Sequence, residues 1–321
     1  MRYILFLFLT LTVFAQKKPE DFGYKHLIFQ YKKLEVNVIV KSKKGEENIQ
    51  KPLFFWCQGS MAQPVLKYDE RGLYGTFPFD ENDFLTDYHL VVVGKPGIPI
   101  ISDVNDLGKD YQYLINNDSV PKIYSDNNYL DYYVNRNDFI IIKLLKEKWV
   151  SKSKLMLAGH SEGSTIAAKL ARKNKKVTHL IYSSGNPYGR ILNILQAGIY
   201  YDKNYDSIDY WKKVVANKNN LEYNGGDTYK ATYDFSQPSA NQLKELKIPI
   251  LITYGTKDWS AQYNDLFYVE SIKVGMKNIT FSPYIDLEHN FFPVNQNLEP
   301  NHEIYNWEKI GKDWLKWIKS N

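Results

Sequence analysis

The sequence predicts an α/β fold in which a mostly parallel β-sheet is covered by helices. Two observations predict it: short, continuously apolar runs recur along the chain, and stretches with helical spacing of apolar residues separate them. A continuously apolar run indicates a strand buried on both faces, which is typical of parallel sheets. With 321 residues, of which 44% are hydrophobic and 24% charged, the chain suits one large globular domain with an insertion.

Seven segments are predicted to be strands. The earliest, 34–40, alternates in part and is β-branched, which indicates a partly exposed strand. The others are continuously apolar: 52–57, 88–94, 155–158, 178–184, 248–254 and 278–283.

Helices are predicted where apolar residues recur with a period near 3.6. In 131–149 the inward residues are expected to be Phe139, Ile142, Leu145 and Trp149. In 161–174 they are expected to be Ile166, Ala167, Leu170 and Ala171. In the C-terminal stretch, Trp307, Ile310, Trp314, Trp317 and Ile318 predict a face that docks on the sheet.

The segment from about 187 to 246 does not fit the strand–helix alternation. A long piece between two core strands that is not a simple crossover is usually a functional insertion. We therefore expect a helical cap over the site, within a single domain that covers residues 16–321.

Residues 1–15 have the pattern of a secretory signal peptide. Arg2 supplies a positive start, residues 3–14 form an apolar run too short to span a bilayer comfortably, and Ala15 ends a candidate cleavage site. The mature chain would then be periplasmic or extracellular, with no stable membrane span after processing. A membrane anchor that is retained is the alternative.

Composition limits the partners and cofactors. The net charge of +5 is scattered, and its short clusters at 41–44 and 172–176 accompany no nucleic-acid-binding motif, so no nucleic-acid partner is expected. No CxxC, HExxH or Cys/His cluster is present, so the sequence implies no metal and no cofactor. Cys57 is the only cysteine, and its apolar surroundings predict a buried structural thiol.

The run Gly159-His160-Ser161-Glu162-Gly163 is the candidate nucleophile site. A GxSxG pattern is common by chance, but this one directly follows a predicted strand and directly precedes a predicted helix, as the motif requires. Its serine must sit on a turn so sharp that the backbone is strained, and side chains at Gly159 and Gly163 would collide with the neighbouring strand and helix. We expect Ser161 to be the nucleophile. Glu162 is expected to favour the helix dipole, with a substrate contact as the alternative.

A serine nucleophile needs a general base and an acid that orients the base, and in sites of this kind they follow the serine in the order acid, then histidine. His289 lies just past the last predicted strand, and Asp258 follows the strand 248–254. His179 lies within a predicted strand, and His302 is expected to cap the last helix. Weaker candidates for the acid are Asp265, Asp286 and Glu288.

An oxyanion hole needs a second backbone N–H from the loop after an earlier strand. The run Gln58-Gly59-Ser60-Met61 follows the strand 52–57 in the right place. We expect the donors to be the backbone N–H groups of Glu162 and Ser60, with Met61 as the alternative to Ser60.

Together these pieces resemble the α/β-hydrolase superfamily over nearly all of the mature chain. The loop at Gln58 and the elbow at Ser161 look most like those of exported bacterial esterases and of serine peptidases of the aminopeptidase or dipeptidyl-peptidase type. The resemblance implies an eight-stranded, mostly parallel sheet flanked by helices, a helical cap, and a triad of Ser161, Asp258 and His289. Two departures are that Ser164 and Thr165 replace a further glycine of many relatives, and that Gln58 stands where many have histidine.

Three hypotheses for function follow. The first is an exported serine hydrolase that cleaves a small-molecule carboxylic ester through an acyl-enzyme. The second is a serine peptidase acting on short peptides with the same triad, where a free amine would bind to an acid: Glu162, Asp202, Asp206 or Asp209. The third is a catalytically inactive binding protein of the same fold, which an opened Ser161–His289 geometry would favour.

Overall fold

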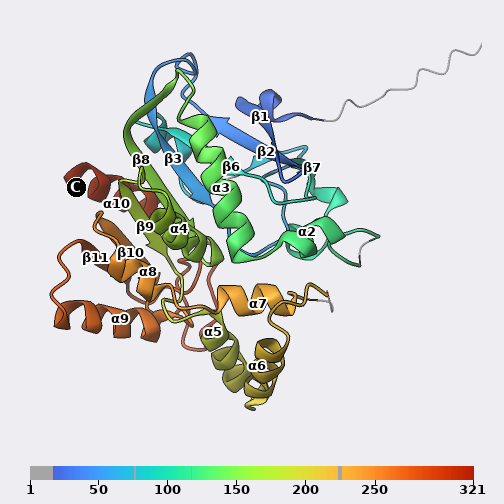
Figure 1. The fold of residues 1–321 in the computed structure, drawn as a ribbon, viewed down its shortest axis with the longest axis vertical. Helices are drawn as coiled ribbons and strands as arrows, with labels where there is room; N and C mark the ends of the chain where they lie inside the picture. The colour runs from blue at the N-terminus through green and yellow to red at the C-terminus, as the bar shows by residue number, and fades with distance from the viewer. Residues whose placement is uncertain (1–16, 76, 117, 223–225) are drawn as a thin grey trace, which may run out of the picture.

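A central eight-stranded sheet organises the computed structural model, which describes residues 17–75, 77–116, 118–222 and 226–321 (Figure 1). The strand order is β1-β2-β6-β3-β8-β9-β10-β11. β1 pairs antiparallel with β2, and β2 pairs antiparallel with β6, whereas all the other pairs are parallel. The strands are β1 Tyr24–Tyr31, β2 Leu34–Lys41, β3 Lys51–Cys57, β6 His89–Val93, β8 Val150–His160, β9 His179–Ser183, β10 Ile250–Gly255 and β11 Ile279–Tyr284.

Helices cover both faces of this sheet. One face packs against α3, α4, α8 (Ala240–Glu245) and α9, and the other packs against α1 and α10. A small second sheet has the order β5-β4-β7. The remaining elements are η1 Pro19–Phe22, β4 Leu66–Asp69, β5 Gly72–Tyr74, α1 Glu81–Leu85, β7 Ile101–Asp103, η2 Val104–Asp106, η3 Lys109–Tyr111, α2 Lys122–Asn127, α3 Leu130–Leu144, α4 Glu162–Lys173, α9 Ala261–Lys273 and α10 Trp307–Ser320.

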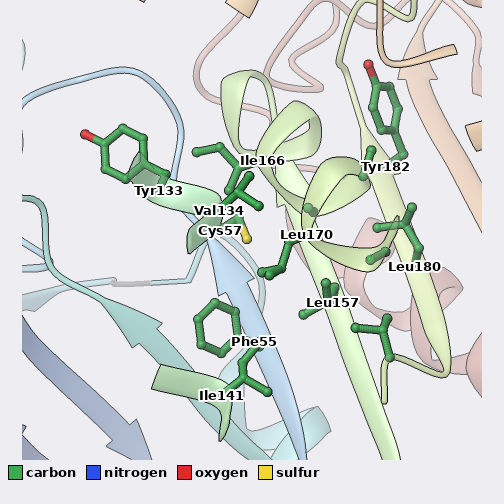
Figure 2. Packing of buried hydrophobic residues seen from close by; sticks show 14 of the residues in the cluster. Phe55, Cys57, Tyr133, Val134, Ile141, Leu157, Ile166, Leu170, Leu180 and Tyr182 are labelled. Atoms are coloured by element: carbon green, nitrogen blue, oxygen red, sulfur yellow. The ribbon is translucent and has the colours of Figure 1, made fainter. Parts of the chain in front are cut away.

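The predicted burial of continuous apolar runs holds at the centre of the sheet. Every residue of β6, β9 and β10 is buried. Side chains of each strand alternate between the two helical layers, so Phe55 and Leu157 face α3 and α4 while Phe54 and Met156 face the other layer. Figure 2 shows the first layer, in which helical side chains such as those of Ile166 and Leu170 pack over the strands.

The predicted faces of α4 and α10 are correct, whereas that of α3 is wrong in part. Ile142 is 48% exposed, and Trp149 lies beyond the end of α3, at Leu144. The buried face of α3 instead carries Ile140, Ile141 and Leu144. The aromatic and aliphatic run around position 140 supports more than one helical stripe, and packing against the sheet selects one of them.

Two further features differ from the sequence predictions. Strand β1 was not expected: it lies at the edge of the sheet and mixes exposed with half-buried residues, so its pattern lacks a clean period. The last helix begins at Trp307, with Asn306 as its N-cap. His302 is therefore not a cap, and its ring packs edge-on against Phe292.

The segment expected to form a cap, about 187–246, joins β9 to β10 and carries its own helices. α5 and α6 project from the body of the domain, and α7 lies between them and α3 (Figure 1). The final helix, α8, packs against α4. The helices are α5 Arg190–Ala197, the π-helical turn η4 Gly198–Asp202, α6 Asp206–Ala216, α7 Tyr229–Phe235 and α8 Ala240–Glu245. The predicted signal peptide, residues 1–15, lies outside the described residues.

Candidate active site

Ser161 occupies a sharp turn between β8 and α4. Its φ of 57° and ψ of −128° lie in a region that serine rarely adopts. A Cβ atom at Gly163 would lie 2.0 Å from the backbone oxygen of Cys57, and one at Gly159 would lie 2.1 Å from the backbone oxygen of Gly163. The turn therefore requires both glycines, for the steric reason that the sequence suggested.

Neighbouring groups hold this strained backbone in place. The N–H of Ser161 donates to the backbone oxygen of Ser183 on β9, at 2.9 Å. The hydroxyl of Ser164 donates to the backbone oxygen of Ser161, at 2.6 Å. Ser164, which stands where many similar elbows have a glycine, thus stabilises the turn from the first turn of α4.

His289 and Asp258 meet beside the turn. Asp258 follows β10 and His289 follows β11, and Nδ1 of His289 lies 2.9 Å from Oδ2 of Asp258. The N–H of Ser260 donates to the other carboxylate oxygen, at 3.0 Å. The Asp258 side chain has no exposed surface, while 30% of the His289 side chain is exposed.

Electrostatics favours the charged form of both partners. Burial alone would raise the pKa of Asp258, but the neighbouring His289 and its hydrogen bond lower this pKa below its ordinary value. Burial alone would lower the pKa of His289, but the Asp258 carboxylate raises it above its ordinary value. The pair is therefore arranged to stabilise a positive charge on the imidazole.

The weaker candidates for the acid have other partners. Asp265 accepts a hydrogen bond from the Tyr254 hydroxyl at 2.5 Å. Glu288 accepts from the backbone N–H of Asn290 at 2.7 Å. Asp286 is exposed and lies 3.6 Å from the Lys257 ammonium.

Ser161 and His289 line one small cavity, of about 60 Å³. No hydrogen bond joins the two side chains within the described residues, so the cavity brings them together without closing the Ser–His contact. Catalytic hydrogen bonds are often long in free enzymes and tighten when substrate binds. The remaining lining residues are Ser60, Glu162, Thr165, Ser184, Gly185, Asn186, Arg190, Asn193 and Phe235.

Two of the three expected oxyanion donors belong to this cavity. Ser60 and Glu162 line it, whereas Met61 is not among its lining residues and is 38% exposed. Glu162 is the first residue of α4, so no preceding helical turn can accept its N–H. The N–H of Ser60 donates to no other group in the described chain.

His160, next to the serine, packs against the candidate base. Its ring centroid lies 4.9 Å from that of His289, and its Nδ1 lies 3.1 Å from the Ser183 hydroxyl. Burial, together with the nearby His289, lowers the pKa of His160 to about 3. The His160 imidazole therefore stays neutral, and its uncharged ring packs against that of His289.

Next to Ser161, a cluster of charged side chains, which no sequence pattern predicted as a group, joins the buried Glu162 and Lys95 to the half-buried Arg190 and the exposed Asp227. Nη1 of Arg190, at the start of α5, lies 2.9 Å from Glu162 Oε2 and 2.9 Å from Asp227 Oδ2. Burial raises the pKa of Glu162 to about 7, against the pull of Arg190 and Lys95. Burial lowers the pKa of Lys95 to about 8, against the pull of Glu162 and Asp227.

Other kinds of site find little support in the described residues. They contain no group of three or more His, Cys, Asp or Glu side chains placed to hold a metal ion. None of their helices combines the length and apolar character needed to cross a membrane. Cys57 is buried, as predicted, and burial raises the pKa of its thiol to about 12.

Comparisons with known proteins establish the fold. No protein-family model and no curated protein matches the chain. Among solved structures, the acylaminoacyl peptidase of Pyrococcus horikoshii superposes with a TM-score of 0.56 at 14% identity, over 92% of this chain and 41% of that one. This chain thus spans about two fifths of that peptidase.

Two neighbours match over nearly their whole length. Est1E from Butyrivibrio proteoclasticus has a TM-score of 0.54 at 12% identity, over 92% of this chain and 99% of its own. An esterase of Pyrococcus furiosus has a TM-score of 0.54 at 14% identity, over 96% and 93%. The predicted fold is confirmed: the protein has the α/β-hydrolase fold, with an eight-stranded, mostly parallel sheet flanked by helices.

Proposed function

We propose that this protein is an exported serine hydrolase that cleaves a carboxylic ester through an acyl-enzyme intermediate. One observation carries the proposal. Ser161, on its strained turn, lines the same cavity as His289, whose Nδ1 is held by the buried Asp258 carboxylate. A nucleophile, a base and an orienting acid are the parts that acyl transfer requires.

The geometry assigns each group a role. Because Nδ1–H of His289 donates to Asp258, the lone pair of Nε2 is free to take the proton of Ser161 as its Oγ attacks the carbonyl carbon. The same nitrogen then protonates the leaving alcohol, and water repeats the sequence to release the acid. Developing charge on the carbonyl oxygen would be met by the N–H groups of Ser60 and Glu162.

The positions of the acidic residues favour an ester over a peptide with a free amine. Oε2 of Glu162 is engaged by Arg190 at 2.9 Å, whereas its Oε1 has no hydrogen-bond partner among the described residues. Asp202, Asp206 and Asp209 are exposed and do not line the cavity. Glu162 is thus the one carboxylate of the four that lines the cavity, and its unpartnered Oε1 lies beside the positive charge of Arg190, which disfavours an ammonium group there.

The size of the cavity indicates a short acyl group. With a volume of about 60 Å³, the cavity has room for only a few water-sized groups, and we expect it to favour short acyl chains. Arg190 and Asn193 of α5 contribute to its lining. In this proposal, the segment 187–246 acts as a cap that limits acyl length, and the predicted signal peptide directs export.

Activity-based labelling tests the proposal directly. A fluorophosphonate should label the mature protein, and the Ser161→Ala variant should neither be labelled nor hydrolyse aryl esters. Ser153→Ala, at an exposed position of β8, is the matched control and should keep both properties. An unlabelled protein, or esterase activity that survives in Ser161→Ala, would refute the mechanism.

A substrate series separates the two reactions. Aryl esters with acyl chains from acetyl to octanoyl should show highest kcat/KM for the shortest chains, and aminoacyl arylamides should be poor substrates. Faster cleavage of the arylamides would instead establish the peptidase alternative.

A further inference from the structure

Two buried side chains donate hydrogen bonds to backbone oxygens of the loop that follows β3. Nζ of Lys95 donates to the backbone oxygen of Gly59 at 2.5 Å. The Tyr124 hydroxyl donates to the backbone oxygen of Ser60 at 2.8 Å. The Gly59 carbonyl belongs to the same peptide unit as the N–H of Ser60, and the Ser60 carbonyl to the same unit as the N–H of Met61. Each expected oxyanion donor in this loop thus has a partly buried hydrogen bond at the carbonyl end of its peptide.

The parallel pairing of β6 with β3 places Lys95 beside this loop. Lys95 comes two residues after β6, which pairs directly with β3, so the carboxyl ends of the two strands lie side by side. Lys95 is 6% exposed, and within the described chain its ammonium donates a hydrogen bond to the Gly59 oxygen alone. Its Nζ also lies 5.6 Å from the centroid of the Tyr124 ring.

We propose that Lys95 is a positioning residue for the hydrolysis reaction, whose ammonium fixes and polarises the peptide that presents the Ser60 N–H to the oxyanion. This inference rests on the proposed function. A charged donor on a carbonyl is stronger than a neutral one, and bonds in such a chain strengthen one another by roughly 10–30% each. An N–H held in place before reaction also needs no reorganisation when negative charge develops.

The charges around Lys95 make this effect dependent on pH. Glu162 on α4 and Asp227 before α7 favour the ammonium, while Arg136 on α3 and Arg190 on α5 disfavour it. Burial outweighs the acids and lowers the pKa of Lys95 to about 8. The two facing tyrosines, Tyr124 on α2 and Tyr133 on α3, have pKa values raised well above their ordinary range. Lys95 is therefore the group that loses its charge as the pH rises past about 8, and kcat should fall there.

Replacing Lys95 by methionine tests the inference, with kcat and KM of the full mature chain measured on a short-chain aryl ester between pH 6 and 10. We expect kcat to fall about 10- to 100-fold, less than the about 10²–10³ of a lost oxyanion donor, with KM changed less than about 2-fold. The alkaline limb near pH 8 should disappear. If Lys95 only stabilised the fold, its replacement would not abolish the decrease of kcat near pH 8 while leaving KM nearly unchanged.

Two further variants keep the test decisive. Lys95→Arg retains the charge, because the guanidinium pKa lies above about 12, so kcat should be largely rescued and the alkaline limb should move beyond pH 10. Lys67→Met removes another lysine whose pKa burial lowers to about 8, but which lies against Gln63 and Pro64, so the limb should remain.

The outcomes separate this inference from the proposed function. If fluorophosphonate labels Ser161 and the wild type hydrolyses esters, but Lys95→Met keeps its kcat and its alkaline limb, the role of Lys95 is refuted and the hydrolase stands. If Lys95→Met does not fold, a limb that stays near pH 8 in Lys95→Arg refutes it equally. Failure of labelling in the wild type would instead remove the proposed function.

Discussion

Two groups of charged side chains near Ser161 have pKa values that shift in opposite senses: one group favours its charged forms, and the other disfavours them. On the side of β10 and β11, the pKa of Asp258 is lowered and that of His289 is raised, so pairing outweighs burial and both groups favour their charged forms. In the cluster of Lys95, Glu162, Arg190 and Asp227, the pKa of Glu162 is raised to about 7 and that of Lys95 is lowered to about 8, so burial outweighs pairing at these two groups. The structure therefore stabilises the charged forms of Asp258 and His289, whereas it destabilises those of Glu162 and Lys95.

This difference indicates a division of labour. A pair that stabilises an imidazolium suits a proton that moves during the reaction. In the second cluster, burial disfavours the charged forms of Glu162 and Lys95, while the pKa of Arg190 is raised, so this cluster suits a framework that shapes the cavity and responds to pH. Substitutions in the two groups should therefore affect different observables.

Loss of the acid should have the largest effect on rate. In Asp258→Asn the amide no longer stabilises the imidazolium and favours the wrong tautomer of His289, so kcat should fall by about 10⁴. Steady-state kinetics with short-chain aryl esters measures this, and fluorophosphonate labelling should slow in parallel. Asp265→Asn, whose carboxylate accepts a hydrogen bond from the Tyr254 hydroxyl, is the control. A similar loss in both variants would show that Asp258 is not the orienting acid.

Loss of the arginine should have its largest effect on stability. Arg190→Met leaves Glu162 and Asp227 without their shared partner, and breaking a buried pair costs about 3–5 kcal/mol. Asp227 is one-third exposed and can be hydrated, so we expect a loss of about 3 kcal/mol or less in urea unfolding at pH 8.

The pH dependence of that loss checks its cause. Glu162 in Arg190→Met should be protonated at pH 5, where a neutral carboxyl tolerates burial, so the loss of stability should be smaller there than at pH 8. The double variant Arg190→Met/Glu162→Gln should recover part of the stability at pH 8. An equal loss at both pH values would mean that packing, not unpaired charge, is responsible.

The sequence was informative where function depends on local pattern. The Gly159–Gly163 turn is encoded by steric requirements within five residues, and it was therefore predictable together with the strand and helix that flank it. Asp258 and His289 could be chosen because each follows a recognisable strand, and parallel strands end at one edge of the sheet. The structure brings these two side chains within 2.9 Å.

The charge cluster could not be predicted, because its members share no local pattern. The cluster of Lys95, Glu162, Arg190 and Asp227 comes from four separate segments of the chain, and only the three-dimensional arrangement brings them together. The burial of Lys95 and Glu162 also contradicts the ordinary expectation for charged side chains. The exposed Ile142 shows the same limit at the level of packing, since a sequence stripe does not say which neighbour will cover it.

The smallest expected effect is on the fall of log kcat/KM at low pH, the acid limb of the pH profile. This limb shows whether His289 or Glu162 is the group that titrates. Only neutral His289 can accept the serine proton, so log kcat/KM should fall with a slope of one as the pH drops below a pKa raised above 6.5. His160, whose pKa is about 3, stays neutral and should add no second proton. Glu162, whose pKa is about 7, takes no part in the proton transfer, so Glu162→Gln should leave the acid limb in place. Asp258→Asn should shift the limb to lower pH, because burial then lowers the pKa of His289 without the opposing carboxylate. A limb that disappears in Glu162→Gln would assign the titration to the charge cluster around Glu162 and contradict the division between the two groups of charges.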